Sequence, residues 1–248
     1  NTKTALNNDN IKFNWGFQRE GFIQSRTFSN DKAIIMSIKI FLDNGAFGIY
    51  KKLSKKGKDG SLMSTLKNRS LDDFSYVNTK DYKSYRKKYA IFLKKHKKYL
   101  NAYANLDVIG NAELTYENQK WFEKHDIYPL PVWHLNTDVK WLRRYIDEGY
   151  SYICIGGMVG VPKKILIEIL DKIWENILTD KNGMPLVKVH GFGMTGFDLM
   201  KRYPWYSVDS STWISLAKFG SIPYPARGKE GKYNWNKINT ILISNRSL

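Results

Sequence analysis

Cysteine is almost absent from this chain, because Cys154 is the single cysteine among 248 residues. One thiol excludes an internal disulfide framework and any zinc site built from several thiolates. It fits a protein of a reducing compartment. The four histidines show neither His-x-His nor His-Glu-x-x-His spacing. We therefore expect no metal site and no cofactor.

Long apolar runs are also missing, since none approaches the roughly 20 residues that a membrane-spanning helix needs. The first residues, Asn1-Thr2-Lys3, lack the basic start, apolar stretch and cleavage site of a signal peptide. The chain does not begin with Met, which predicts a processed protein or a fragment. We expect a soluble, intracellular protein without a membrane partner.

Acidic residues are scarce relative to basic ones: 23 Asp and Glu stand against 40 Lys and Arg, a formal net charge of +17. Such an imbalance bears on partners rather than on fold, and a nucleic acid is the leading candidate. The alternative is that the charge serves only solubility or nonspecific adhesion. The remaining composition, 42% hydrophobic and 25% charged, argues against global disorder.

The positive charge is concentrated in residues 51–100, which hold 16 Lys and Arg but only four Asp and Glu. The beginning of this segment mixes Lys with Gly and Ser, which is typical of a loop. Its second half has aromatic residues at spacings of three, four or seven, which predicts a helix with an aromatic face in the core. These aromatic residues are Tyr82, Tyr85, Tyr89, Phe92 and Tyr99.

Basic side chains alternate with this aromatic face. They form either its solvated opposite side or a surface that contacts the phosphate backbone of a nucleic acid. The candidates for nucleic-acid binding are Arg86, Lys87, Lys88, Lys94, Lys95, Lys97 and Lys98.

Short apolar runs alternate with helical patterns from residue 33 onward. The expected helices include 111–124, with Asn111 as N-cap, and an amphipathic helix that Pro162 opens. This alternation predicts parallel strands with crossover helices, and it favours a (β/α) barrel over an open doubly wound sheet without deciding between them. The expected strands are 33–42, 102–106, 128–133, 151–155, 185–189 and 205–208.

Polar residues follow directly after these expected strands. Asp43, Asp107 and Asp209 each come after one, and so do His134 and His190. In a parallel barrel all these ends meet on one face, where barrel enzymes place their active sites. A single Asp in such a place is usually a turn or capping residue. Three Asp and two His at corresponding positions indicate an active site.

Three carboxylates without a cysteine cluster suit two kinds of chemistry. Metal-dependent hydrolysis is one, although the histidine spacing gives it little support. Glycosidic-bond chemistry is the other: one carboxylate attacks the anomeric carbon, and a second moves the proton of the leaving group. A third carboxylate is then available for the edge of a nucleobase. Glycines such as Gly156 and Gly157 allow a flat base to approach the backbone closely.

Four segments of the sequence are similar to a known family in their order and spacing. They are residues 42–47, 106–110, 156–160 and 190–213. They resemble the guanine-transglycosylase superfamily, most closely its DNA-modifying branch of phage and bacterial enzymes that place 7-deazaguanine bases in DNA. The resemblance implies an α/β fold, a TIM-like (β/α)8 barrel that is compact or incomplete. We expect one such domain over residues 1–248, with a lysine-rich insertion at about 51–100 after an early strand.

The resemblance also implies an activity, the exchange of guanine in DNA for a free 7-deazaguanine base without strand cleavage. Asp209 would be the nucleophile that attacks C1′, and Asp43 the general acid and base. Asp107 would bind the guanine-type edge of the base, and Phe47 and His190 would sandwich it. The implied base contacts are therefore Asp107, Phe47, His134, Gly156, Gly157 and His190.

The sequence departs from this family in three respects. The tRNA-acting members have a zinc site of several cysteines and a histidine, which a single cysteine cannot build. Asn44 stands where the family usually has Ser, so we expect different hydrogen bonds around Asp43. The chain is also short, which suggests a homo-oligomer or a partner subunit, and its basic insertion would bind DNA in place of a lost accessory region.

Three other functions stay open. A tRNA-guanine transglycosylase that dispenses with zinc would act on a structured RNA loop. A base-excising glycosylase would use water as the second nucleophile. A nucleic-acid-binding barrel would be catalytically silent, although three aspartates at strand ends speak against it. We expect the protein in the cytoplasm, which is the cytoplasm of the host cell if a phage encodes it.

Overall fold

The computed structural model describes residues 40–53, 74–194, 196–210, 216, 218–228 and 232–243. Most of the expected strand 33–42 and residues 54–73 of the expected lysine-rich insertion lie outside these residues. The described strands are β1 (Phe41–Leu42), β2 (Ala102–Tyr103), β3 (Val132–His134), β4 (Tyr152–Gly156), β5 (Lys188–Gly191), β6 (Ser207–Val208), β7 (Ser221–Arg227) and β8 (Tyr233–Leu242). The α-helices are α1 (Ala46–Leu53), α3 (Lys80–His96), α4 (Ala112–Glu123), α5 (Lys140–Asp147), α6 (Lys163–Ile173) and α7 (Phe197–Arg202). Short 3-10 turns cover Ser75–Asn78 and Lys97–Tyr99, and a π-helical turn, Trp174–Leu178, extends α6.

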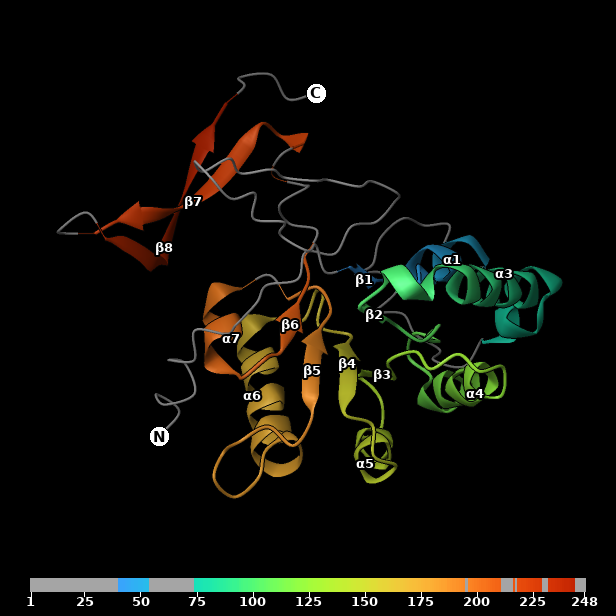
Figure 1. The fold of residues 1–248 in the computed structure, drawn as a ribbon. Coiled ribbons are helices and arrows are strands. Elements are labelled where there is room, and N and C mark those ends of the chain that lie inside the picture. Colours follow the sequence, from blue (N-terminus) through green and yellow to red (C-terminus); the bar gives the residue numbers. More distant parts are fainter. Residues whose placement is uncertain are drawn as a thin grey trace, which may run out of the picture.

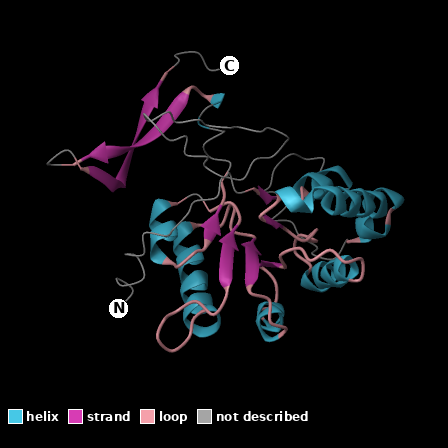
Figure 2. Ribbon diagram, in the orientation of Figure 1, coloured by secondary structure: helices cyan, strands magenta, loops and turns pink. Residues whose placement is uncertain are grey.

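Parallel strands with helical crossovers form the body of the molecule (Figures 1 and 2). Strands β1 and β2 pair in parallel, and β3, β4, β5 and β6 form a second parallel sheet in that order. An isolated parallel bridge between Ala104 and Leu130 connects the two sheets. The strands therefore follow one another in space as they do in the sequence, which is the arrangement that repeated β-α units produce.

The two faces of the four-stranded sheet bury different residues. Ile153, Ile155 and Val189 pack in one hydrophobic cluster with Leu166 and Leu170 of α6. The other face forms a smaller cluster of Phe41, Ala104, Val132 and Cys154. Alternate residues of a strand point to opposite faces, so the sheet has a helix-covered outer side and an inner side.

The inner side is curved enough for distant strands to touch. The ring of Phe41 in β1 stacks on His190 in β5, with 4.1 Å between ring centroids and 15° between the planes. Among the described strands, pairing runs from β1 to β6 and no pairing joins β6 back to β1. The mixed α/β class with parallel sheets is thus observed, whereas the eight-stranded closed barrel stays a prediction.

A second core lies beside β1 and β2, and helix α3 supplies much of it. Tyr82, Tyr89 and Leu93 of α3 are buried with Phe122 of α4. The expected aromatic face is therefore correct for its first part. Its last two members, Phe92 and Tyr99, are exposed. Phe92 lies on α3 itself, whereas α3 has ended before Tyr99 and a 3-10 turn directs the chain toward β2.

Helix α4 confirms the predicted N-cap. The side chain of Asn111 accepts a hydrogen bond of 2.9 Å from the backbone N–H of Leu114, which satisfies one of the free donors of the first turn. Pro162 is the N-cap of α6 rather than its first helical residue, and its carbonyl accepts from Leu166 N–H at 2.9 Å. Both helices therefore begin within one residue of the expected positions.

The expected strand 185–189 is displaced toward its C-terminal side. Pro185 forms an antiparallel bridge with Thr179, and Leu186 N–H donates to the carbonyl of Leu178. The first apolar residues of this run thus close a local turn, and the parallel strand begins only at Lys188. A short apolar run indicates burial or pairing but does not tell which partner it takes.

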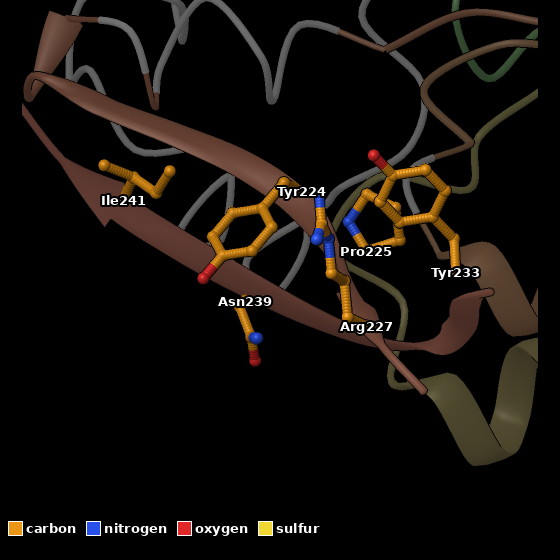
Figure 3. Close-up of a pocket in the computed structure, with 6 residues that line it drawn as sticks. All are labelled: Tyr224, Pro225, Arg227, Tyr233, Asn239 and Ile241. Carbon is orange, nitrogen blue, oxygen red and sulfur yellow. The ribbon is translucent and has the colours of Figure 1, made fainter. Parts of the chain in front are cut away.

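Strands β7 and β8 form an antiparallel hairpin apart from the parallel sheets (Figure 1). The hairpin holds a hollow of about 660 Å³, lined by residues from both strands (Figure 3). These residues are Tyr224, Pro225, Arg227, Tyr233, Asn239 and Ile241.

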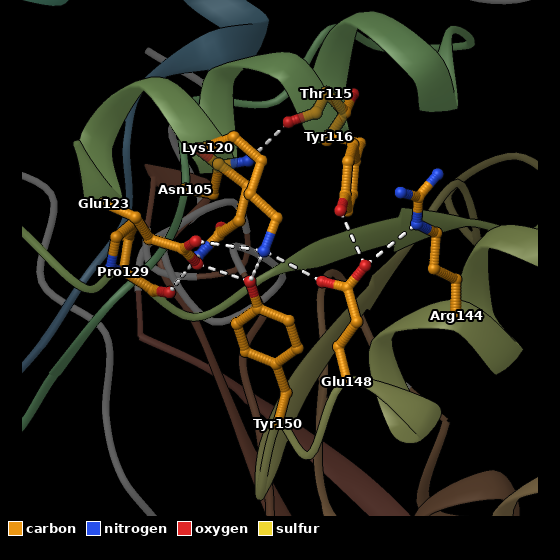
Figure 4. A network of polar contacts seen from close by, with 10 residues as sticks. Asn105, Thr115, Tyr116, Lys120, Glu123, Pro129, Arg144, Glu148 and Tyr150 are labelled. Atoms are coloured by element: carbon orange, nitrogen blue, oxygen red, sulfur yellow. Dashed lines mark hydrogen bonds and ion pairs between the residues drawn. The ribbon is translucent and has the colours of Figure 1, made fainter.

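A polar network joins helices α4 and α5 (Figure 4). Lys120 Nζ lies 3.0 Å from Glu123 Oε2, 2.8 Å from Glu148 Oε2 and 3.0 Å from the hydroxyl of Tyr150. Glu148 also accepts hydrogen bonds from Tyr116 and Arg144. Every charge in this network has an opposite partner, so it holds the two helices together rather than presenting a reactive group.

None of the described helices combines the length and apolar character that crossing a membrane requires.

Candidate functional site

Three aspartates gather at the carboxyl ends of the parallel strands. Asp43 follows β1, Asp107 follows the Ala104 bridge and Asp209 follows β6. The thiol of Cys154 in β4 lies near enough to all three aspartates to be affected by their charges. Its pKa is raised well above its ordinary value, first by complete burial and then by the charges of all three carboxylates. Strand ends that are far apart in the sequence thus place three acidic groups within electrostatic range of Cys154.

Asp209 is held in position by its own strand and by the loop after β5. The backbone N–H of Gly193 donates to Asp209 Oδ1 at 2.6 Å, and the backbone N–H of Asp209 donates to the carbonyl of Gly191 at 3.2 Å. Burial raises the pKa of Asp209 to about 6, the hydrogen bond from Gly193 opposes this shift, and the negative charge of Asp43 adds to it. Near neutral pH this carboxylate is therefore ionised but poorly solvated.

Asp107 is buried with both of its oxygens engaged. His134 Nε2 lies 3.0 Å from Oδ2, and Asn44 Nδ2 donates to Oδ1 at 2.7 Å. Each carboxylate oxygen accepts more than one hydrogen bond, so Asp107 keeps acceptor capacity beyond these partners. The two contacts fix the orientation of the carboxylate at the end of its strand.

Asn44, which the sequence singled out for its hydrogen bonds around Asp43, also contacts Asp107, and this second contact was not predicted. Its amide nitrogen also donates to the carbonyl of Asn105, and its oxygen accepts from the backbone N–H of Ala46 at 2.6 Å. Its own carbonyl accepts from the hydroxyl of Tyr85 at 2.8 Å. Asn44 thereby joins the end of β1 to Asp107 and to α3. The sequence signal for it was the Asp-Asn-Gly motif, which is equally typical of a simple turn.

The two glycines after β4 make room for His134 and its loop. A Cβ atom on Gly156 would lie 2.7 Å from Cδ2 of His134, and Gly157 has a φ of +79°. A side chain at Gly156 would therefore displace the imidazole that pairs with Asp107. In this structure the closest group to Gly156 is a protein side chain, whereas the resemblance assigns the glycine to a base.

Phe47 and His190 differ in accessibility. His190 is 1% exposed, packed on Phe41, and its Nδ1 lies 2.6 Å from the hydroxyl of Ser207. Burial lowers the pKa of His190 to about 3, so the ring is neutral. Phe47 is 45% exposed on α1. A base reaches the His190 ring only after its present packing opens, so the predicted sandwich stays a prediction.

Beneath the aspartates, the inner face contains a hydrogen-bonded chain that the sequence did not indicate. The hydroxyls of Tyr152 and Ser207 are 2.5 Å apart, and Ser207 contacts His190 as described. His190 Nε2 is buried and has no hydrogen-bond partner within the described residues. Only the pairing of β4, β5 and β6 brings these side chains together.

No protein family, curated protein or solved structure matches this chain. The functional interpretation therefore depends on the chain's own residues and their geometry. Within the described residues there is also no cluster of three or more side chains that could hold a metal ion.

The basic residues of α3 and its following turn divide into two groups. Arg86 is half-buried: its guanidinium donates to Asn118 at 2.8 Å and lies 4.3 Å from the ring centroid of Trp121. Arg86 therefore packs α3 against α4. In this it differs from the other basic residues that the sequence predicted to bind nucleic acid. The remaining candidates are exposed, and they are Lys87, Lys88, Lys94, Lys95, Lys97 and Lys98.

Proposed function

We propose that this protein is a nucleobase-exchange enzyme that replaces guanine in DNA with a 7-deazaguanine base through a covalent aspartyl-glycosyl intermediate. The observation that carries the proposal is the pair formed by Asp209 and Asp43. Both lie at strand ends; burial raises the pKa of Asp209 to about 6, and the negative charge of Asp43 adds to this shift. Two carboxylates with different environments are what glycosidic exchange requires.

In the first step, Asp209 attacks C1′ of the target nucleotide, and the bond from C1′ to guanine N9 breaks. The reactive form has Asp209 ionised and Asp43 protonated. The bonding electrons leave with the base, and the protonated Asp43 supplies the proton that neutralises it. The hydrogen bond from Gly193 holds Oδ1 of Asp209, so Oδ2 is the oxygen assigned to the attack. A desolvated carboxylate is a better nucleophile than one surrounded by water.

In the second step, Asp43 takes the proton from N9 of the incoming 7-deazaguanine base. This nitrogen attacks C1′, and the bond to Asp209 breaks with its electrons returning to the carboxylate. The enzyme is thereby restored to its starting protonation state. No oxidant, metal or cofactor enters the balance of either step.

Asp107 is the candidate for reading the base edge. Its contacts with His134 and Asn44 hold a charged acceptor in one orientation, which suits the paired N–H donors on the Watson–Crick edge of guanine. For duplex DNA the base must first leave the stack. The exposed lysines on α3 and its following turn supply a surface for the phosphate backbone.

A base-exchange assay tests the proposal. The protein is incubated with duplex DNA or tRNA carrying labelled guanine, together with a panel of 7-deazaguanine bases, and the products are digested to nucleosides for mass analysis. We expect a deazaguanine nucleoside from DNA, lost in Asp209→Asn and retained in Asp147→Asn. Asp147 is an exposed aspartate on α5 and serves as the matched control.

Other outcomes contradict the proposal in distinguishable ways. Exchange in tRNA alone would assign the protein to the RNA-acting alternative. An abasic site in place of a new base would identify a glycosylase. Binding of DNA without any release of guanine would leave a nucleic-acid-binding protein.

A further inference from the structure

The β7–β8 hairpin lines one hollow with aromatic and polar residues from both strands, and its register shifts beside them. Pro225 pairs with Ile238, but the next residue, Ala226, pairs with Asn234. Extra residues on β8 therefore form a bulge, which increases the local twist of the hairpin. Tyr224, Pro225 and Arg227 of β7 line the same hollow together with residues of β8 (Figure 3).

The hollow presents ring faces and polar groups to the outside. Tyr224 is 37% and Tyr233 is 56% exposed, and each comes from a different strand. Arg227 pairs with Tyr233 across the hairpin, and Asn239 pairs with Tyr224. Each tyrosine thus has a hydrogen-bonding side chain directly opposite it, with the apolar side chain of Ile241 at the edge.

The charge around the hollow selects an anionic partner. Arg227 brings a cation into the hollow, within a chain whose net charge is +17. An apolar partner would use the ring faces but would not use this cation. A nucleic-acid strand uses both, since its bases stack on aromatic rings and its phosphates attract the cation.

We propose that the hollow of the β7–β8 hairpin binds an unpaired DNA strand, with bases stacked on Tyr224 and Tyr233 and a phosphate held by Arg227. An intact duplex hides the faces of its bases in the stack, so exposed tyrosine rings suit unpaired nucleotides. The choice of DNA over RNA rests on the proposed function, in which a target base leaves the duplex and its strand is locally unpaired.

Fluorescence anisotropy with a labelled thymidine 20-mer and with a mixed-sequence duplex of equal length tests this proposal. All proteins carry Asp209→Asn, so binding is measured without turnover. Tyr224→Leu and Tyr233→Leu keep apolar bulk in the hairpin and remove the stacking surface. We expect each to weaken single-strand binding about 5- to 100-fold and to change duplex binding less than about twofold. Tyr224→Phe keeps the ring and retains binding.

Tyr128→Ala is the control, because Tyr128 is 66% exposed but lies on the loop between α4 and β3. A 2-aminopurine placed in the strand gives a second readout, since stacking quenches its fluorescence. We expect quenching with the parent protein and with Tyr224→Phe, and its loss with Tyr224→Leu.

Unchanged single-strand affinity in the double leucine variant would overturn the proposal, as would an equal loss of duplex binding. Tighter binding of the matching RNA strand would overturn the choice of DNA. A dimer in sedimentation velocity that Tyr224→Leu dissociates would assign the hollow to self-association instead. Because binding is measured on Asp209→Asn protein, failure of base exchange in the unmodified enzyme contradicts the proposed function alone.

Discussion

At the scale of single residues, the environment of each aspartate differs although all three follow strands. Asp107 is fixed by His134 and Asn44. Asp209 is held by one backbone N–H and has a pKa raised to about 6, mainly by burial. Equivalent positions in a repeated fold therefore carry different chemistry, because neighbouring side chains and solvent access differ.

The raised pKa of Asp209 predicts that the rate of base exchange decreases at acid pH. The nucleophile must be ionised, so kcat/KM is expected to fall as the pH drops through about 6. Rates measured from pH 5 to 8 check this, with DNA affinity measured over the same range as the control. A rate that stays constant between pH 5 and 7 would contradict the assignment.

The raised pKa of Asp209 also affects stability: its contribution to the free energy of unfolding is lost as the pH rises, whereas the exchange activity is expected to increase. A carboxyl group whose pKa is raised on folding stabilises the fold below its unfolded value of 3.8, and that contribution is lost as the pH rises through about 6. At pH 7.5 Asp209→Asn is expected to increase the free energy of unfolding by about 1 kcal/mol, a value reduced for partial exposure. Urea unfolding of both proteins measures it. Destabilisation at pH 7.5 would refute the burial argument.

A single carbon added at Gly156 is expected to disturb the contact between His134 and Asp107. Alanine would place Cβ 2.7 Å from His134 Cδ2, so the imidazole must move away from Asp107. We expect Gly156→Ala to lower exchange about 10- to 100-fold because the base reader is misplaced. Gly48→Ala on α1 is the control, since a Cβ there meets nothing within 4 Å. Normal exchange in Gly156→Ala would contradict the assignment of His134 to the site.

At the scale of elements, helices were predicted more closely than strands. The 3.6-residue period and a capping side chain are local signals, and α4 and α6 begin within one residue of their expected positions. The strands β3, β5 and β6 are shifted toward the C-terminal ends of their apolar runs. Their bounds depend on pairing partners elsewhere in the chain, which a short apolar run does not specify.

The network between α4 and α5 predicts a pH-dependent contribution to stability. Burial opposes ionisation of Glu148, but hydrogen bonds from Lys120, Tyr116 and Arg144 lower its pKa to about 2. A carboxyl group with a lowered pKa stabilises the fold above its unfolded value of 4.5, and this contribution is lost as the pH falls through about 2. We expect Glu148→Gln to cost about 1 kcal/mol at pH 7 and less at pH 3.5.

Urea unfolding at the two pH values measures this difference, with Asp147→Asn as the neighbouring control on α5. The cost is small because the network is partly exposed to solvent. An equal cost at both pH values would show that Glu148 acts through packing rather than through its charge.

At the scale of the whole molecule, charge is distributed unevenly over two surfaces. The exposed lysines of α3 and its following turn form one, and the β7–β8 hairpin forms the other. The first presents closely spaced cations, which suits a phosphate backbone, and the second presents aromatic rings, which suits bases. Two surfaces of different chemistry would allow a paired and an unpaired part of the same DNA to be held at once.

The lysine surface predicts a steep salt dependence of duplex binding. Neutralising Lys94, Lys95, Lys97 and Lys98 with glutamine is expected to reduce the slope of log K against log salt by up to about 3.6, because each phosphate contact contributes about 0.9. Titrations between 50 and 300 mM salt measure this slope. Exposed lysines elsewhere, such as Lys181 and Lys124, supply matched controls. An unchanged slope in the quadruple variant would exclude this surface as the duplex contact.

The sequence by itself determined the features that depend on local pattern: the helices, the N-cap at Asn111 and the net charge. It also indicated that aspartates follow strands. Only the tertiary structure decided their partners. Asn44 and Asp107 are 63 residues apart and Phe41 and His190 are 149 apart, yet both pairs touch. Local periodicity specifies which face a residue takes, whereas the partner on that face depends on how distant strands pair and how far the sheet curves.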